Sequence, residues 1–126
     1  MKKLLLIFAI VAAIPTFATR NDDGSPADFK ITKYSFGKIP QSKPVTTAFT
    51  FTNISDKPLV IEVATAECGC TTPDYPKTPI LKGKTGIIKV TYNAANLGSF
   101  TKNVTVKFAN IASPIILTIE GEVVQK

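Results

Sequence analysis

The sequence predicts an all-β protein, an immunoglobulin-like antiparallel β-sandwich of about seven strands. First, Val, Ile and Thr make up nearly a third of the residues after Ala18, whereas Leu is rare. Branched side chains lose rotamer freedom in helices and pack well on pleated sheets. Second, apolar and polar residues alternate in run after run, which is typical of half-buried antiparallel strands. Third, no stretch after Ala18 shows a helical stripe, and short strands separated by turns favour a sandwich.

Residues 1–18 are predicted to be a secretory signal peptide. Two lysines precede the unbroken apolar run Leu4–Ile14, and small residues at Thr16 and Ala18 are suited to a signal peptidase. The run is shorter than the roughly 20 apolar residues that span a bilayer. We therefore expect cleavage after Ala18, export to the periplasm or the extracellular space, and no membrane span in the mature chain.

The next segment, Thr19–Asp28, is polar and rich in turn residues, so we expect a flexible tail. The sandwich domain is predicted to cover residues 29–126. Its first strand, near Phe29–Phe36, has apolar residues that change face along the run. A bulge or kink near Lys33 would account for this change.

Five further strands show clear period-two alternation, and a short seventh strand is predicted near Pro79–Leu81. Turn residues separate the runs, as at Asn53–Pro58 and Asn110–Pro114. In a strand, alternate side chains share one face, so each apolar set is expected to face the core. The predicted core residues are Phe49, Phe51, Ile61, Val63, Ile88, Val90, Tyr92, Val104, Val106, Leu117 and Ile119.

The charge pattern gives no sign of nucleic-acid binding. The whole chain has a net charge of +6, but its lysines are scattered, and Arg20 is the only arginine. A nucleic-acid surface would combine clustered basic residues with interleaved aromatic ones. We therefore interpret the lysines as a solvated surface.

The composition also argues against an enzyme. The chain has no histidine, the residue that most often activates a serine or cysteine nucleophile. The carboxylates are read as turn or strand-face residues, and no pair of them is set by spacing. We expect no catalytic residues and no cofactor; an enzyme that uses lysine and carboxylate groups is the weakest alternative.

The only cysteines are Cys68 and Cys70, with Gly69 between them. Two thiolates without histidine cannot complete the four ligands of a structural zinc site, so no metal site is predicted. A local disulfide is one expectation, because Gly69 would permit a tight turn; a pair of buried free thiols is the other. Binding of Cu(I) and disulfide exchange remain alternatives, although thioredoxin-type motifs have two residues between the cysteines.

The segment after the cysteines is predicted to be a recognition loop at one end of the sandwich. Prolines restrict its backbone. Loops on a rigid scaffold often carry recognition. The candidate contact residues are Thr71, Thr72, Asp74 and Tyr75.

Several blocks of the chain resemble the bacterial domain-of-unknown-function family 1573. They include Phe49–Asn53, Asp56–Ile61, Cys68–Thr71 and Gly121–Val123. The resemblance implies an immunoglobulin-like sandwich of the PapD-like and major-sperm-protein-like branch, and it implies no biochemical function. We therefore expect an exported, non-catalytic module that binds a protein or a cell-envelope component through an exposed sheet edge. A thiol-based Cu(I)-binding or disulfide-exchange protein is the alternative.

Overall fold

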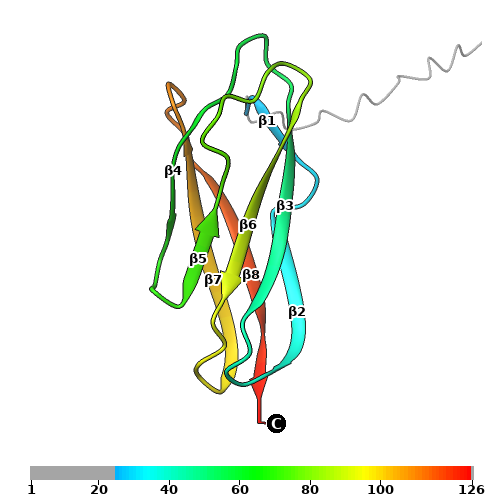
Figure 1. Ribbon diagram of the computed structural model, residues 1–126, viewed down its shortest axis with the longest axis vertical. Coiled ribbons are helices and arrows are strands. Elements are labelled where there is room, and N and C mark those ends of the chain that lie inside the picture. Colours follow the sequence, from blue (N-terminus) through cyan, green and yellow to red (C-terminus); the bar gives the residue numbers. More distant parts are fainter. Residues whose placement is uncertain (1–24, 126) are drawn as a thin grey trace, which may run out of the picture.

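The computed structural model describes residues 25–125, which form two sheets of four strands packed face to face (Figure 1). The predicted signal peptide (residues 1–18), residues 19–24 of the predicted tail and Lys126 lie outside this range. Sheet A has the order β1-β3-β6-β5, and sheet B has the order β2-β8-β7-β4. The strands are β1 (Ala27–Phe29), β2 (Lys33–Pro40), β3 (Val45–Asn53), β4 (Ile61–Ala66), β5 (Thr71–Asp74), β6 (Thr85–Tyr92), β7 (Gly98–Phe108) and β8 (Ile115–Val124).

The predicted all-β immunoglobulin-like sandwich is confirmed, with eight strands and one departure from antiparallel pairing. The edge strand β2 runs parallel to β8, whereas every other paired strand is antiparallel within the described residues. The chain leaves sheet A after Phe29 and enters sheet B at Lys33, where the sequence predicted a kink. A register shift between Ser35 and Lys38, with Gly37 at φ 69°, bends β2 further.

The core lies between the inner faces of the two sheets. Phe49, Phe51 and Phe108 have no exposed surface, and the Phe51 and Phe108 rings contact edge to face at 5.5 Å between centroids. All the predicted core residues except Val63 are buried. Period-two alternation therefore identified the inner faces of β3, β6, β7 and β8.

Val63 was wrongly assigned to the core, because it is 42% exposed. Relative to β7, the register shifts between Ile61, which pairs with Phe108, and Val63, which pairs with Lys107. A bulge adds one residue to the strand, and side chains after it point to the opposite face. Val63 therefore points away from the core although it follows the apolar spacing.

The structure also differs from the sequence prediction at β1 and β5. β1 pairs with β3, and Ala27 is 5% exposed, so the ordered domain begins before Phe29, within the segment predicted as a tail. The expected strand near Pro79–Leu81 is reduced to a single bridge between Leu59 and Ile80. The chain instead forms β5 in the segment that was predicted as a loop.

Asn53 joins two loops at the end of the sandwich where β3 stops. Its side chain is fully buried; Nδ2 donates to the carbonyl oxygens of Lys57 at 2.7 Å and Ile80 at 2.8 Å. Its Oδ1 accepts hydrogen bonds from the backbone N and the Oγ of Ser55. This one residue therefore fixes the β3–β4 loop against the β5–β6 loop.

Candidate functional site

The two cysteines form the turn at which the chain crosses from β4 of sheet B to β5 of sheet A (Figure 1). The structure pairs Cys68 with Cys70, with their Cα atoms 5.3 Å apart. Gly69 does not have a positive φ, and a Cβ built on it would meet no atom within 4 Å. The turn therefore does not require glycine, contrary to the argument made from the sequence.

The side chain of Thr71 is buried against this turn instead of facing solvent. It is 4% exposed, and its Oγ1 lies 3.9 Å from the Cys68 Sγ and 3.6 Å from the Cys70 Sγ. The Cys70 carbonyl accepts a hydrogen bond from the Asn93 backbone N at 2.9 Å. The turn is thus attached to the end of β6, and Thr71 is not available as a contact residue.

Thr72 and Asp74 lie on β5, and both are exposed. In the pairing with β6, Thr72 is opposite Thr91 and Asp74 is opposite Lys89. This stretch is therefore an edge strand and not the loop that the sequence predicted, whereas its role in recognition stays a prediction.

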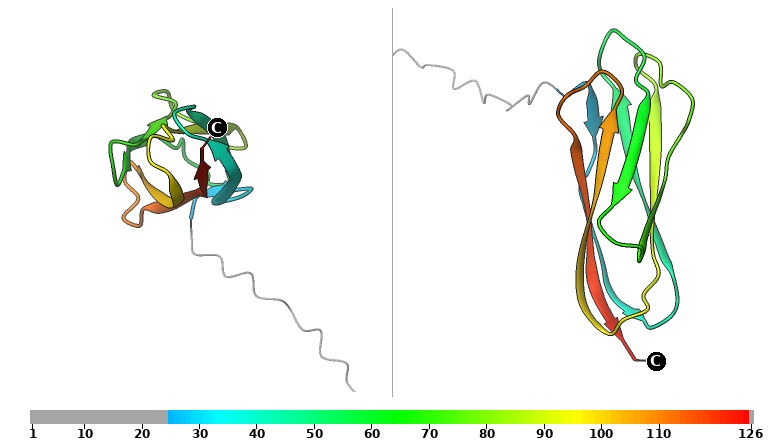
Figure 2. Two further views of the ribbon diagram at one scale, coloured as in Figure 1. Left: turned by 90° about the horizontal axis from the view of Figure 1, so that it is seen from below. Right: turned by 90° about the vertical axis from the view of Figure 1, so that its left-hand side faces the viewer.

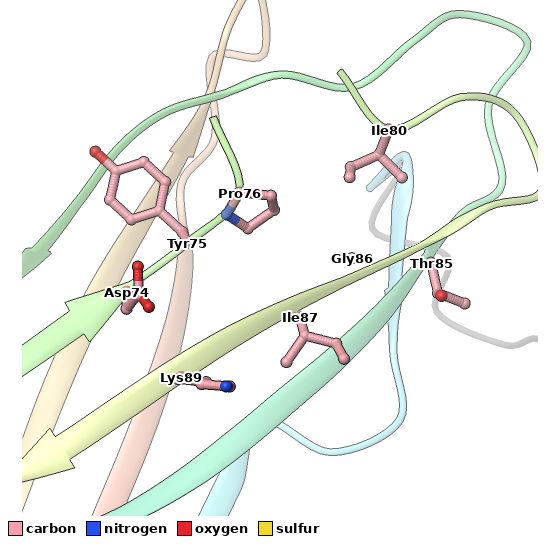
Figure 3. A pocket seen from close by; sticks show the side chains of 8 residues that line it. All are labelled: Asp74, Tyr75, Pro76, Ile80, Thr85, Gly86, Ile87 and Lys89. Atoms are coloured by element: carbon pink, nitrogen blue, oxygen red, sulfur yellow. The ribbon is translucent and has the colours of Figure 1, made fainter. Parts of the chain in front are cut away.

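Tyr75 follows directly after β5, is partly buried and packs against the core. The Nζ of Lys77 lies 3.2 Å from the centroid of its ring, a cation–π contact. Of the four predicted contact residues, the structure brings Asp74 and Tyr75 together beside β6 (Figure 3).

One stretch of β6 has a strand partner on one side only. β3 pairs with β6 along its whole length, from Thr85 to Tyr92, whereas β5 pairs only with its second half, from Lys89 onward. We call the stretch Thr85–Ile88 the open β6 edge. Figure 2 (right) faces this side of the sandwich, where β5 is much shorter than its neighbours.

The direction of the backbone groups along β6 follows from two backbone hydrogen bonds at its ends. The Asn93 N–H points to the β5 side, where it bonds the Cys70 carbonyl, and the Lys84 carbonyl points to β3, where it accepts from Asn53 N. In an antiparallel strand, successive residues direct their backbone groups to alternate sides. The N–H and C=O groups of Thr85 and Ile87 therefore point out of the open β6 edge.

A groove of about 400 Å³ runs beside the open β6 edge (Figure 3). Gly86 lies on the side of the strand that faces the core, because a Cβ built on it would lie 2.6 Å from Cε1 of Phe51. The side chains of Tyr75, Pro76 and Ile80 give the groove apolar walls. The full lining is Asp74, Tyr75, Pro76, Ile80, Thr85, Gly86, Ile87 and Lys89.

Metal ligands do not gather elsewhere in the described part of the chain. Between residues 25 and 125, no group of three or more His, Cys, Asp or Glu side chains could hold a metal ion. The same range contains no helix that is long and apolar enough to cross a membrane.

Sequence reasoning missed the open β6 edge because such an edge consists of backbone groups. One signal was present: Thr71 and Thr72 are β-branched residues followed by Pro73, a combination compatible with a short edge strand. Pro73 is opposite Val90, whose backbone groups point to β3, so the missing proline N–H costs this ladder no hydrogen bond.

The fold defines a PapD-like immunoglobulin-type sandwich. The ASH/PapD-like domain 7 of human CEP192 has a TM-score of 0.67 at 5% identity, over 80% of this chain and 87% of that domain. A protein of unknown function from Porphyromonas gingivalis W83 has a TM-score of 0.65 at 13% identity over 76% of this chain, which spans 46% of that protein. The VesB protease of Vibrio cholerae has a TM-score of 0.63 at 14% identity over 79% of this chain, which spans 32% of that protease. At these identities the likeness extends to the fold alone.

The chain belongs to the family of proteins of unknown function DUF1573, whose model matches residues 27–123. The match covers every strand of both sheets except the last residue of β8. No curated protein is similar enough to the chain to count as a relative.

Proposed function

We propose that this chain is an exported, non-catalytic module that binds an extended segment of another protein as an added strand. The observation that carries the proposal is the coincidence of the open β6 edge with the groove beside it. In β-strand addition, main-chain hydrogen bonds supply affinity and a pocket for alternate side chains supplies specificity. The backbone groups of Thr85 and Ile87 offer the hydrogen bonds, and the groove offers the pocket.

Other strand edges are less suited to this role. The outer edges of the edge strands β1, β5, β2 and β4 are also free in the sheet order, but this groove lies along β6. A flat free edge gives backbone hydrogen bonds to any strand, whereas a groove adds selection among side chains.

The lack of catalytic groups supports a binding role. There is no histidine in the chain, and the ion pair between Lys82 and Asp56, at 2.7 Å, is highly exposed. Exposed pairs of this kind contribute little and offer no desolvated site for acid–base chemistry. Export is supported by the predicted signal peptide, residues 1–18.

A photo-crosslinking amino acid at position 87 tests the proposal. Ile87 and Ile116 are similarly exposed, at 48% and 46%, but Ile116 lies on β8 of the other sheet and is the matched control. In the cell envelope of the native host, we expect a discrete protein adduct from position 87 and none from position 116. Equal adducts from both positions, or none from position 87, would contradict strand addition at this edge.

The thiol alternative concerns the same side of the sandwich. Because the structure pairs Cys68 with Cys70, Cu(I) would bind only after the pair is reduced. Titration of the reduced protein with Cu(I), with a Cys68→Ser, Cys70→Ser variant as control, tests this function. Stoichiometric uptake that the variant loses would favour the copper site, and equal uptake would dismiss it.

A further inference from the structure

The geometry points to the chemistry of the bound segment: three consecutive residues in the order acidic, apolar, acidic, in an extended strand of a partner protein. This inference rests on the proposed function and specifies its ligand. It follows from three features of the open β6 edge, namely its length, the face of each residue and the charges at its two ends.

The length follows from the register of β5. Asp74 is opposite Lys89, so Tyr75 continues the line of β5 at the level of Ile88, where it packs against the core. Beyond Tyr75 the positions opposite Ile87, Gly86 and Thr85 have no strand partner. A partner strand that continues the line of β5 beyond Tyr75 can therefore pair with three residues of β6.

The face of each residue sets the position of the apolar side chain. Residues directly opposite each other in a sheet place their side chains on the same face. Gly86 faces the core side, whereas Ile87 is exposed on the outer face. A partner residue opposite Gly86 would thus point into the groove, between Tyr75 and Ile80, where an apolar side chain is favoured.

Charge sets the two flanking residues. Partner side chains opposite Ile87 and Thr85 would lie on the outer face of β6, the face on which Lys89 is exposed. Asp74 is opposite Lys89 and is the one carboxylate in the groove lining. Lys84 is exposed and directly precedes Thr85. A carboxylate opposite Ile87 would therefore lie near Lys89, and a carboxylate opposite Thr85 would lie at the start of β6, where Lys84 is.

The loop that precedes the open β6 edge is also basic. Between β5 and β6 the chain carries three lysines (77, 82 and 84) and no aspartate or glutamate. Lys82 is paired with Asp56, whereas Lys84 directly precedes Thr85. The field at this end of β6 is therefore positive and would attract an acidic segment.

Lysines at a free edge also have a purely protective function, because they discourage edge-to-edge aggregation. Protection requires no preference among peptide sequences and no occupant of the groove. Selective binding of one sequence pattern therefore separates the two explanations.

The test is an NMR titration of the ¹⁵N-labelled mature chain with the peptide acetyl-Ser-Glu-Val-Glu-Ser-amide at millimolar concentration. One control peptide replaces both Glu residues by Lys, and a second replaces Val by Ser. We expect chemical-shift changes centred on the amides of Thr85 and Ile87, and binding that is at least about tenfold weaker for either control. Higher salt should weaken the binding of the Glu peptide.

Two variants locate the site on the open β6 edge. Ile87→Pro removes an N–H that points away from β3, so the variant keeps the β3–β6 ladder and loses a donor to the partner. Ile87→Thr keeps that N–H and is the matched control. We expect the first to lose peptide binding by about tenfold or more and the second to keep it; dispersed spectra of both establish that they are folded.

The outcomes separate the two proposals. A protein adduct at position 87 without preference for the Glu-Val-Glu peptide overturns the inferred chemistry and leaves the proposed function standing. Selective binding that Ile87→Pro does not weaken overturns the location. If neither an adduct nor a peptide complex forms, both the function and the inference are wrong.

Discussion

Replacing Asn53 by alanine should destabilise the domain strongly, because this side chain makes three hydrogen bonds to the β3–β4 loop and one to the β5–β6 loop. Only the bond to the Ile80 carbonyl is fully buried, and that carbonyl keeps a second donor, the Leu59 N–H at 2.9 Å. Loss of a buried partner costs about 1–3 kcal/mol, and the partly buried bonds add about 0.5–1.5 kcal/mol each where water cannot replace them. We expect a loss of about 2–4 kcal/mol in the free energy of unfolding.

Urea unfolding of the mature protein, followed by circular dichroism, measures this change. Since the slope is about 1–3 kcal/mol per molar urea for small domains, the midpoint should fall by about 0.7–4 M with an unchanged slope. Asn103→Ala is the control, because it removes an asparagine side chain that makes a single hydrogen bond. The partly buried Oδ1 of Asn103 accepts that bond from Thr118 Oγ1 at 2.9 Å. If Asn53→Ala lowers the midpoint no more than Asn103→Ala, the view that Asn53 holds the two loops together is wrong.

Three further predictions use the same protein. Gly86→Ala should cost about 1–3 kcal/mol in urea unfolding, because its Cβ would displace the buried ring of Phe51, whereas Gly69→Ala should change stability by no more than about 0.5 kcal/mol. Cys68→Ser with Cys70→Ser should fold with modestly lower stability, because the bridge closes a very short loop; a variant that fails to fold would contradict this. Intact-mass measurement of the exported protein should show a chain that starts directly after Ala18; a chain that keeps residues 1–18 would refute the signal-peptide prediction.

The sequence predicted the longer strands because their two faces differ in polarity. Each of β3, β6, β7 and β8 has one face against the core and one face toward solvent, and alternation records that difference. It fails where the backbone departs from a regular pleat, as at the bulge that turns Val63 outward. It also fails for β1 and β5, which are too short to show a period.

The candidate site was less predictable than the fold, because it depends on which strands are neighbours. Residues 71–75 were selected as a loop on local composition, and only Asp74 and Tyr75 of the four candidates line the groove. Ile80 and Gly86 reach the same groove through the sheet order, which no local pattern reveals.

Proline chemistry explains why the β6 edge is open where it is. The hydrogen-bonded pairs between β5 and β6 involve residues of β6 whose backbone groups point to β5, such as Lys89 opposite Asp74. Two residues further along the same register, Pro76 would be opposite Ile87 and would have to donate an N–H that proline lacks. The chain therefore leaves the sheet after Tyr75, and the backbone groups of Ile87 remain without a partner. Pro76 thus both ends β5 and leaves the position opposite Ile87 open. A segment of another protein that has a backbone N–H at this position, in place of the proline ring, can complete the ladder.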